Sequence, residues 1–409
     1  MTMGETLKET VMLEDQRICP AADTLARIMP LMPTFGITRL AIITGLDRLS
    51  MPVVAAIRPN ARSIAISQGK GVTLAQAKAS ALMEAIEIWH AERVDGPVFY
   101  ASIADLEGRQ DFVDLDRLPL TPKGPLPRHR RAHWVCAVDL MSHHQKLVPL
   151  EMVHADYTLP APGDVGYFPA STNGLASGNH RLEALCHAIC EVIERDALSV
   201  WHHLPVAAKR ATRLDLKTVT EPGLHSSLQK FATADLDVAV WEVTTDIGAP
   251  SFLCLVIDPA SDTEHLGLGS GTHPDPVIAL HRALNEAAQT RLNYISGARE
   301  DLFFDEFSAA GRRRKRAPFQ TLLQGAGPQR DFTDIAIFPL TTLEAELDWL
   351  KDRLRDIGTT EIAVVDLSRT EHDIPVVRVI IPGLEAPHDD AAYVPGPRAR
   401  HAVEHMVAR

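Results

Sequence analysis

Three segments of the chain place polar residues at the spacing of a single helix face. At 100° per residue, positions i, i+4 and i+7 lie within roughly 60–80° of one another around a helix. Each predicted helix therefore carries a narrow polar stripe through alanine- and leucine-rich surroundings. The stripes consist of Ser80, Glu84 and Glu87, then of Glu183, His187, Glu191 and Glu194, and finally of Arg282, Glu286 and Gln289.

Several of these residues are glutamates, whose carboxylates repel one another when they are brought together in a partly buried setting. A hard divalent cation removes this repulsion, and Mg²⁺ prefers oxygen ligands that it shares with phosphate groups. Lys70, Arg195 and Arg282 could neutralise phosphate oxygens directly. The pattern therefore favours an ATP–Mg²⁺ site built on helices. Its candidate metal ligands are Glu84, Glu87, Glu191, Glu194 and Glu286.

Two other interpretations of these residues stay open at this point. Acids on helices most often face solvent, so the stripes also fit the outer faces of amphipathic helices. Against that interpretation, Ala, Leu, Ile and Cys flank the acids closely, and lysines are sparse on the three helices. Cys186 and Cys190, beside His187, could ligate zinc, but no second ligand pair follows at zinc-site spacing. We therefore expect the two cysteines to pack as small apolar residues.

Glycine-containing segments precede the helices and are interpreted as turns. The stretch SQGKGVT, residues 67–73, offers backbone N–H groups, a lysine and hydroxyls at a helix N-terminus, where anions are favoured. The Walker A pattern, GxxxxGK followed by Ser or Thr, is absent, and GLGSG at 267–271 is a weak nucleotide-binding signal. A nucleotide site in this chain would therefore use neither common phosphate-binding scaffold.

The elements that must position these residues are short strands and long helices. Runs rich in β-branched residues predict strands within 37–46, 52–59, 63–71, 133–141, 146–157, 237–258, 361–368 and 375–383. Helical patterns lie at 74–93, 180–203, 276–294 and 344–358. Thr73 and Gln76 form a capping box at the start of the first of these helices. The basic run RRRKR, residues 312–316, is interpreted as a solvated loop.

The composition is that of an ordinary globular protein and disfavours several other classes. The 409 residues, 45% hydrophobic and 23% charged, are enough for a sizeable core. A formal net charge of -12 disfavours general binding to nucleic acid. The five cysteines make no disulfide framework, and neither a secretory signal nor an apolar run of membrane-spanning length is found. We therefore expect a cytoplasmic protein that binds neither nucleic acid nor membranes.

Several ordered blocks together resemble the YcaO-domain family. The blocks are SQGKGVTLAQAKASALMEAIE, NGLASGNHRLEALCHAICEVIERDA, GSGTHPDPVIALHRALNEAAQTRL, PVVRVIIPGLE and YVPGPRAR. Within the family, the N-terminal sequence is most similar to the group that works with TfuA-like partner proteins. The implied organisation is a leader at 1–35, a YcaO domain with α/β subdomains at 36–400, and a tail at 401–409. The implied fold is α+β, with mixed sheets and three long helices that form an ATP/Mg²⁺ site.

The resemblance implies an enzyme that uses ATP and Mg²⁺ to activate a backbone amide of a precursor peptide or protein. A nucleophile adds to the amide carbonyl, ATP phosphorylates the resulting oxyanion, and loss of phosphate leaves an azoline, an amidine or a thioamide. Such chemistry belongs to the biosynthesis of ribosomally made, post-translationally modified peptides. The family's nucleotide-site motifs map onto Lys70, Ser80, Glu84, Glu87, Asn173, Glu183, Glu191, Glu194, Arg195, Arg282, Glu286 and Gln289.

The resemblance and the stripes differ at a few positions. Asn173 comes from the resemblance alone, whereas His187 lies on a stripe without a family counterpart. Ile88 stands where the family often has an arginine, so that phosphate contact must come from elsewhere or be absent. The chain ends HAVEHMVAR, without the PxPxP tail of azoline-forming members, which favours thioamide formation or another backbone activation. The resemblance to the TfuA-associated group implies a TfuA-like partner protein. The alternatives are azoline formation and a nucleotide-binding scaffold without its own chemistry. The resemblance also implies a homodimer.

Overall fold

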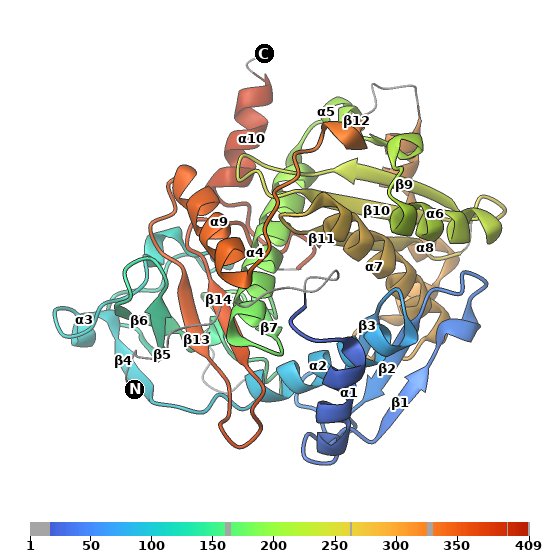
Figure 1. The fold of residues 1–409 in the computed structure, drawn as a ribbon. Coiled ribbons are helices and arrows are strands. Elements are labelled where there is room, and N and C mark those ends of the chain that lie inside the picture. Colours follow the sequence, from blue (N-terminus) through green and yellow to red (C-terminus); the bar gives the residue numbers. More distant parts are fainter. Residues whose placement is uncertain (1–16, 160–164, 262–263, 325–329, 391, 408–409) are drawn as a thin grey trace.

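A computed structural model describes residues 17–159, 165–261, 264–324, 330–390 and 392–407. Helix α4 (Arg181–His203) runs through the middle of the molecule, with strands on both sides of it (Figure 1). Of the predicted leader and tail, residues 1–16 and 408–409 lie outside the described residues.

In the part of the chain that the structure describes, the strands form three antiparallel sheets and one short parallel pair. The first sheet has the order β1 (Arg39–Ile42), β2 (Val53–Ile57) and β3 (Ile66–Lys70). The second has the order β11 (Gly267–Thr272), β10 (Ser251–Ile257) and β9 (Asp237–Glu242). The third has the order β4 (Val98–Ser102), β5 (Arg131–Asp139), β13 (Ala363–Asp366), β14 (Val376–Ile380) and β7 (Leu175–Ser177), and β6 (Gln145–Pro149) pairs with β5. The parallel pair is β8 (Leu214–Asp215) with β12 (Arg330–Asp331).

The long helices pack on these sheets and confirm the α+β class predicted from the sequence. Helix α2 (Leu74–Ala91) lies on β2 and β3, and α7 (Pro276–Ser296) lies on β10 and β11. Helix α4 contacts β7 and β14 of one sheet and β11 of another, so it links the two halves of the molecule. The other helices are α1 (Ala21–Ile28), α3 (Ile103–Leu106), α5 (Val206–Ala211), α6 (Pro222–Thr233), α8 (Ala309–Leu323), α9 (Leu343–Asp356) and α10 (Pro397–Val407).

The sequence of α4 fixes which of its faces is buried against the six-stranded sheet. Leu185, Ile189 and Val192 belong to an apolar cluster with residues of β13, β14 and α9. Burial of each such side chain stabilises the fold by about 1.5–3 kcal/mol. The polar stripe of the helix consequently points away from this cluster, toward α2 and α7.

The glycine segments before α2 and α7 belong largely to strands. Strand β3 lies inside the strand predicted within 63–71, so that prediction is confirmed. Strand β11 covers the segment 267–271 that was interpreted as a turn, and that interpretation is wrong. Gly69 lies in β3 and Gly269 in β11. A Cβ on Gly69 would lie 2.0 Å from the backbone nitrogen of Ala81, and one on Gly269 would lie 2.2 Å from that of Ala287. Glycine is needed here because each helix backbone rests directly on its strand. In a single sequence, glycine required for close packing looks like glycine in a turn.

The basic run RRRKR is also misassigned by the sequence, because it lies within helix α8. Arg314 forms an ion pair with Asp305, and Lys315 forms one with Glu306. Arg316 is 9% exposed. Acids in the turn before the helix therefore neutralise part of the run, and the helix buries another part of it.

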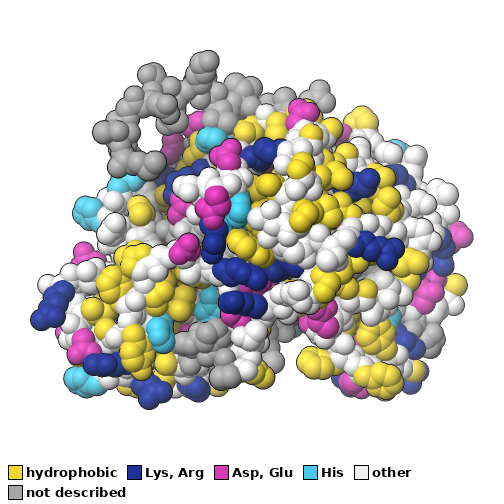
Figure 2. Space-filling model, turned by 90° about the horizontal axis from the view of Figure 1, so that it is seen from below, with side chains coloured by type: hydrophobic (Ala, Val, Ile, Leu, Met, Phe, Trp, Pro, Cys, Tyr) yellow, Lys and Arg dark blue, Asp and Glu magenta, His cyan; other side chains and the backbone are white. Residues whose placement is uncertain are grey.

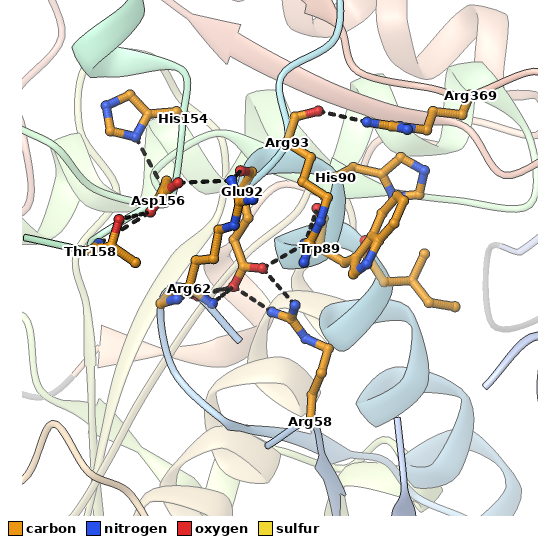
Figure 3. A network of polar contacts seen from close by, with 12 residues as sticks. Arg58, Arg62, Trp89, His90, Glu92, Arg93, His154, Asp156, Thr158 and Arg369 are labelled. Atoms are coloured by element: carbon orange, nitrogen blue, oxygen red, sulfur yellow. Dashed lines mark hydrogen bonds and ion pairs between the residues drawn. The ribbon is translucent and has the colours of Figure 1, made fainter. Parts of the chain in front are cut away.

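A buried carboxylate anchors the C-terminal end of α2. Arg58 donates to both oxygens of Glu92 at 2.6 Å, and the backbone amides of Arg62 and Ser63 donate at 2.9 and 3.0 Å (Figure 3). Burial raises the pKa of Glu92, but its hydrogen bonds with Arg58 outweigh burial and the net shift is downward. A paired and hydrogen-bonded buried charge of this kind fixes local geometry. This end of α2, which also carries Glu87 in the preceding turn, is thereby held in register with β2.

The surface is not uniformly acidic, despite the formal net charge of -12. Figure 2 shows lysine and arginine side chains gathered near the middle of the face seen from below.

Within the described ranges, no helix combines the length and the apolar character that a membrane span requires.

Candidate functional site

The polar stripes of α4 and α7 meet at β3 and β11. Lys70, at the end of β3, forms an ion pair with Glu286 of α7. The Ser270 hydroxyl of β11 donates to Glu194 Oε1 at 2.7 Å and also lies 3.3 Å from Glu286 Oε1. These contacts bring together one predicted residue from α4, one from α7 and one from β3.

The stripe of α2 lies in the same cluster of carboxylates. Burial raises the pKa of Glu87 well above its usual value, and the neighbouring Glu191 and Glu84 raise it further. Burial also raises the pKa of Glu191 to about 7, although Arg195 opposes the shift. The pKa values of Glu84 and Glu194 are raised, in both cases chiefly by burial. The carboxylates of the three helices are partly buried and influence one another's ionisation, and those of α4 and α7 share the Ser270 hydroxyl. The stripes therefore face one another and are not simply the outer faces of amphipathic helices.

Cations compensate the acids unevenly across this cluster. Burial raises the pKa of Glu286, but Lys70 and then Arg195 outweigh burial, and the net shift is downward. Arg195 lies 4.0 Å from Glu191, and its own pKa is raised because Glu194 and Glu191 outweigh its burial. Charge is therefore balanced at Glu286, while the carboxyls of α2 and Glu191 keep raised pKa values. A bound cation would relieve this imbalance.

Three other predicted residues make polar contacts around the cluster. Glu183, 4% exposed at the start of α4, forms an ion pair with Arg17. Arg282 donates to the backbone oxygen of Thr272 at 3.0 Å, and burial lowers its pKa. Gln289 donates to the backbone oxygen of Gln68 at 2.5 Å, which connects α7 to β3.

Polar contacts do not tie the two remaining predicted residues, Ser80 and Asn173, to the carboxylate cluster. Ser80 is partly exposed, one turn before Glu84 on α2. Asn173 lies in a turn, and strand β7 separates that turn from α4. Its Oδ1 atom is buried and has no hydrogen-bond partner within the described ranges. A buried acceptor of this kind is rare without a partner, so Asn173 is available to a donor on a ligand.

The carboxylates do not form a ready-made metal cage. No group of three or more His, Cys, Asp or Glu residues converges on one point in the part of the chain that the structure describes. Lys70 and Ser270 draw Glu286 and Glu194 to themselves instead. This arrangement still fits Mg²⁺, which commonly uses one or two protein carboxylates and completes its shell with water and phosphate.

Several residues of the site escaped the sequence analysis. Ser270 was seen only as part of a weak glycine motif, and Arg17 lies in the predicted leader, far in sequence from Glu183. Arg299 lowers the pKa of Glu84 from the segment after α7, and a hydrogen bond from Ser177 lowers that of Glu87. A charged residue inside an apolar strand, Arg378 in VVRVI, was the one available signal.

The cysteines of α4 pack behind the polar stripe, as the sequence predicts. Cys186 and Cys190 are buried in the apolar cluster of α4, β13 and β14. Burial raises the pKa of both thiols. Burial also lowers the pKa of His187 well below its usual value, so its imidazole is neutral at pH 7. The two thiols thus lie in the apolar interior, as expected of small packing residues.

The affinity for Mg²⁺–ATP is expected to rise with pH through neutrality. Burial raises the pKa of Glu191 from 4.5 to about 7, so Mg²⁺ must displace a proton from this carboxyl. Between these values the folded protein binds the proton more tightly than the unfolded chain, so the metal-free fold loses stability as the pH rises. Melting curves at about pH 6, 7 and 8, with and without Mg²⁺–ATP, test this. The ligand-induced rise in Tm should grow with pH, and a constant rise would contradict the role of Glu191.

Comparison with known proteins identifies the family. A family model described as YcaO cyclodehydratase, ATP- and Mg²⁺-binding, matches residues 68–385. An uncharacterized protein in the tfuA 3′ region of Rhizobium leguminosarum bv. trifolii is 32% identical over 379 residues, which is 91% of this chain and 89% of that protein. An uncharacterized protein of Methanothermobacter thermautotrophicus is 36% identical over 383 residues, which is 91% of this chain and 96% of that protein.

Solved structures show the same fold. YcaO from Methanopyrus kandleri, bound with AMPPCP and Mg²⁺, superposes with a TM-score of 0.75 at 24% identity and covers 95% of this chain and 98% of that one. A heterocyclase in complex with substrate and cofactor superposes with a TM-score of 0.79 at 24% identity over 93% of this chain, which spans about half (54%) of the heterocyclase. The predicted YcaO-type fold is thus confirmed. The chain is a member of the YcaO family of ATP-dependent, Mg²⁺-binding, peptide-modifying enzymes.

Proposed function

We propose that this protein activates a backbone amide of a peptide or protein by phosphorylation and that the product is a thioamide. The observation that carries the proposal is the cluster of partly buried carboxyls on α2, α4 and α7, together with the Lys70–Glu286 ion pair. Bringing these carboxylates together without a cation lowers the stability of the folded protein, and a bound cation and ligand would offset that loss. When bound, ATP supplies the phosphoryl group that turns the amide oxygen into a leaving group.

The residues of the cluster have distinct roles in this proposal. Mg²⁺ would be held by a subset of Glu84, Glu87, Glu191, Glu194 and Glu286. Lys70, Arg195 and Arg282 would neutralise phosphate oxygens, because they bring positive charge to the cluster. Lys70 pairs with Glu286, Arg195 lies 4.0 Å from Glu191, and Arg282 donates to the backbone oxygen of Thr272. Gln289 and Ser270 would hold β3, β11 and α7 in the spacing that the ligand requires. Ser80, Asn173 and Glu183 would support the nucleotide from the edges of the site.

The relative in the tfuA 3′ region supports thioamide formation with a TfuA-like partner. Incubation with that partner, a precursor peptide, Mg²⁺–ATP and a sulfide source should then yield a product roughly 16 Da heavier, because sulfur replaces oxygen. High-resolution mass spectrometry with fragmentation identifies the residue that changes. Omission of sulfide is the matched control and should leave the peptide unmodified.

Two alternatives give other outcomes in the same experiment. A product roughly 18 Da lighter, formed without sulfide, would show loss of water and azoline formation, and would overturn the thioamide proposal. A nucleotide-dependent rise in Tm with neither product, across the precursor peptides tested, would favour a scaffold without its own chemistry.

A homodimer and a cytoplasmic location belong to the same proposal. All five cysteines are unpaired in the structure, as expected in a reducing compartment. Light scattering of the purified protein gives the mass of the assembly and decides between monomer and dimer.

A further inference from the structure

Strand β14 carries one charged residue among apolar neighbours. Arg378 is 2% exposed and is preceded and followed by fully buried valines, Val377 and Val379. Its register partners on the adjacent strands are Val365 on β13 and Leu175 on β7. A guanidinium at such a position is expensive to bury unless acceptors surround it.

Among the described residues, the hydrogen-bond acceptors available to Arg378 are too few. A guanidinium has five N–H donors. Arg378 Nη2 donates to the backbone oxygen of Ser171 at 2.5 Å. Its Nε and Nη1 atoms are buried and have no hydrogen-bond partner among the residues that the structure describes. Buried donors in native proteins nearly always have partners, so these point to acceptors that are not part of the described chain.

The surroundings of Arg378 connect it to the carboxylate cluster. Burial lowers its pKa to about 10, while Tyr157, Glu191 and Glu87 raise it, so the side chain remains a cation at neutral pH. Arg378 therefore lies close to the acids of α2 and α4. Lys70 also lies at the cluster, beside Glu286. A ligand held by these acids would thus have both cations, Arg378 and Lys70, near it.

No cation from α2 occupies the place near Glu87. Ile88, one turn after Glu84, is apolar and 4% exposed.

A cavity of about 30 Å³ lies beside Arg378 and is also lined by Ser171, Asn173, Val192 and Glu385. One water molecule fits this volume and could satisfy one or two donors. Water supplies no negative charge, however, and a guanidinium binds most strongly to paired anionic oxygens.

We propose that Arg378 binds phosphate oxygens of the ligand held at the carboxylate cluster. This inference rests on the proposed nucleotide-dependent function and adds to it a phosphate-binding residue from the six-stranded sheet. The oxygens come either from the terminal phosphate of ATP or from the phosphate released after transfer. A planar guanidinium can bind the phosphate oxygens from either source, and the experiment distinguishes ATP from released phosphate.

The experiment measures the binding of Mg²⁺ complexes of ATP, ADP and AMP to the full-length protein by titration calorimetry. In the Arg378→Gln variant, the Kd for ATP should rise by about 10-fold to 100-fold, which is the effect of losing charge-assisted hydrogen bonds. Binding of AMP should be unchanged. If ATP binding is unchanged but inorganic phosphate no longer binds beside ADP, the contacted oxygens are those of the released phosphate, which also supports the proposal.

The control is Arg316→Gln, which removes another arginine that is 9% exposed and has an unpartnered Nε atom, but which lies on α8. This variant should bind all nucleotides as the wild type does. If Arg378→Gln fails to fold, Arg378→Lys keeps the charge without the planar fork and should weaken ATP binding by a smaller factor.

Two outcomes overturn the inference. In the first, the tested variant (Arg378→Gln, or Arg378→Lys if the former does not fold) binds every nucleotide and phosphate as the wild type does. In the second, the folded variant loses affinity for AMP as strongly as for ATP. The second result would mean that the substitution disturbs the whole site. If the wild type itself binds no nucleotide, the proposed function fails, which is a separate result.

Discussion

Replacement of Glu191 by glutamine is expected to reduce substrate-dependent ATP hydrolysis by about 100-fold or more. Glutamine has nearly the same shape, so the substitution removes the negative charge and leaves the packing of α4 intact. Glu191 lies at the centre of the charged cluster: Arg195 is 4.0 Å away, and both Glu87 and Glu194 influence its ionisation or are influenced by it. Phosphate release in the presence of precursor peptide and partner measures the effect.

The matched control is Glu107→Gln, at a glutamate that is 60% exposed and paired with Arg128 on the surface. Surface pairs contribute little, so this variant should hydrolyse ATP at the wild-type rate. Glu191→Gln should also melt at a higher temperature than the wild type at about pH 8 without Mg²⁺, because it removes a repelling charge. Wild-type hydrolysis by Glu191→Gln would show that this carboxylate is not a metal ligand.

Replacement of Gly69 by alanine is expected to destabilise the fold by about 3 kcal/mol or more. The added Cβ would lie 2.0 Å from Ala81 N and 2.1 Å from Ala77 O, both backbone atoms of α2. Backbone cannot move aside as the end of a flexible side chain can, so α2 must shift away from β3. Chemical denaturation measures the free energy of unfolding, and the midpoint should fall while the slope stays constant.

The control for this variant is Gly45→Ala, because a Cβ at Gly45 would meet nothing within 4 Å. That substitution should change stability by less than about 1 kcal/mol. The Gly69 variant should also bind Mg²⁺–ATP more weakly, because a shift of α2 moves Glu84 and Glu87 relative to Lys70. A Gly69→Ala protein as stable as Gly45→Ala would mean that α2 and β3 are not packed as closely as the structure shows.

The helices and their polar faces could be predicted because their signals are local and periodic. The capping box at Thr73 and Gln76 and the bounds of α2 and α4 follow from such signals and are confirmed. Strand β11 was misread as a turn because its glycines serve contacts with α7, which follows it in the chain, whereas β3 lies inside a predicted strand. The helix over RRRKR was missed because its neutralising acids, Asp305 and Glu306, stand outside the run.

The site was predictable to the extent that its residues share helix faces. Glu191 and Glu194 are one turn apart, so their association needs no knowledge of the fold. Ser270, Arg17 and Arg378 reach the cluster from β11, the predicted leader and β14, and only the tertiary arrangement brings them there. The assignment of individual residues to metal and phosphate stays a prediction that the variants above test.

The position of α4 between two sheets has a consequence for the local opening motions of the protein. Because α4 packs on β7 and β14 on one side and on β11 on the other, any opening that parts the two sheets detaches α4 from at least one of them, and detachment from β11 breaks the hydrogen bond between Ser270 and Glu194. Nucleotide binding is then expected to stabilise the packing of α4 on both sheets at once. Bound nucleotide would slow amide hydrogen exchange in β14 and β10 together, although these strands lie on opposite sides of the helix.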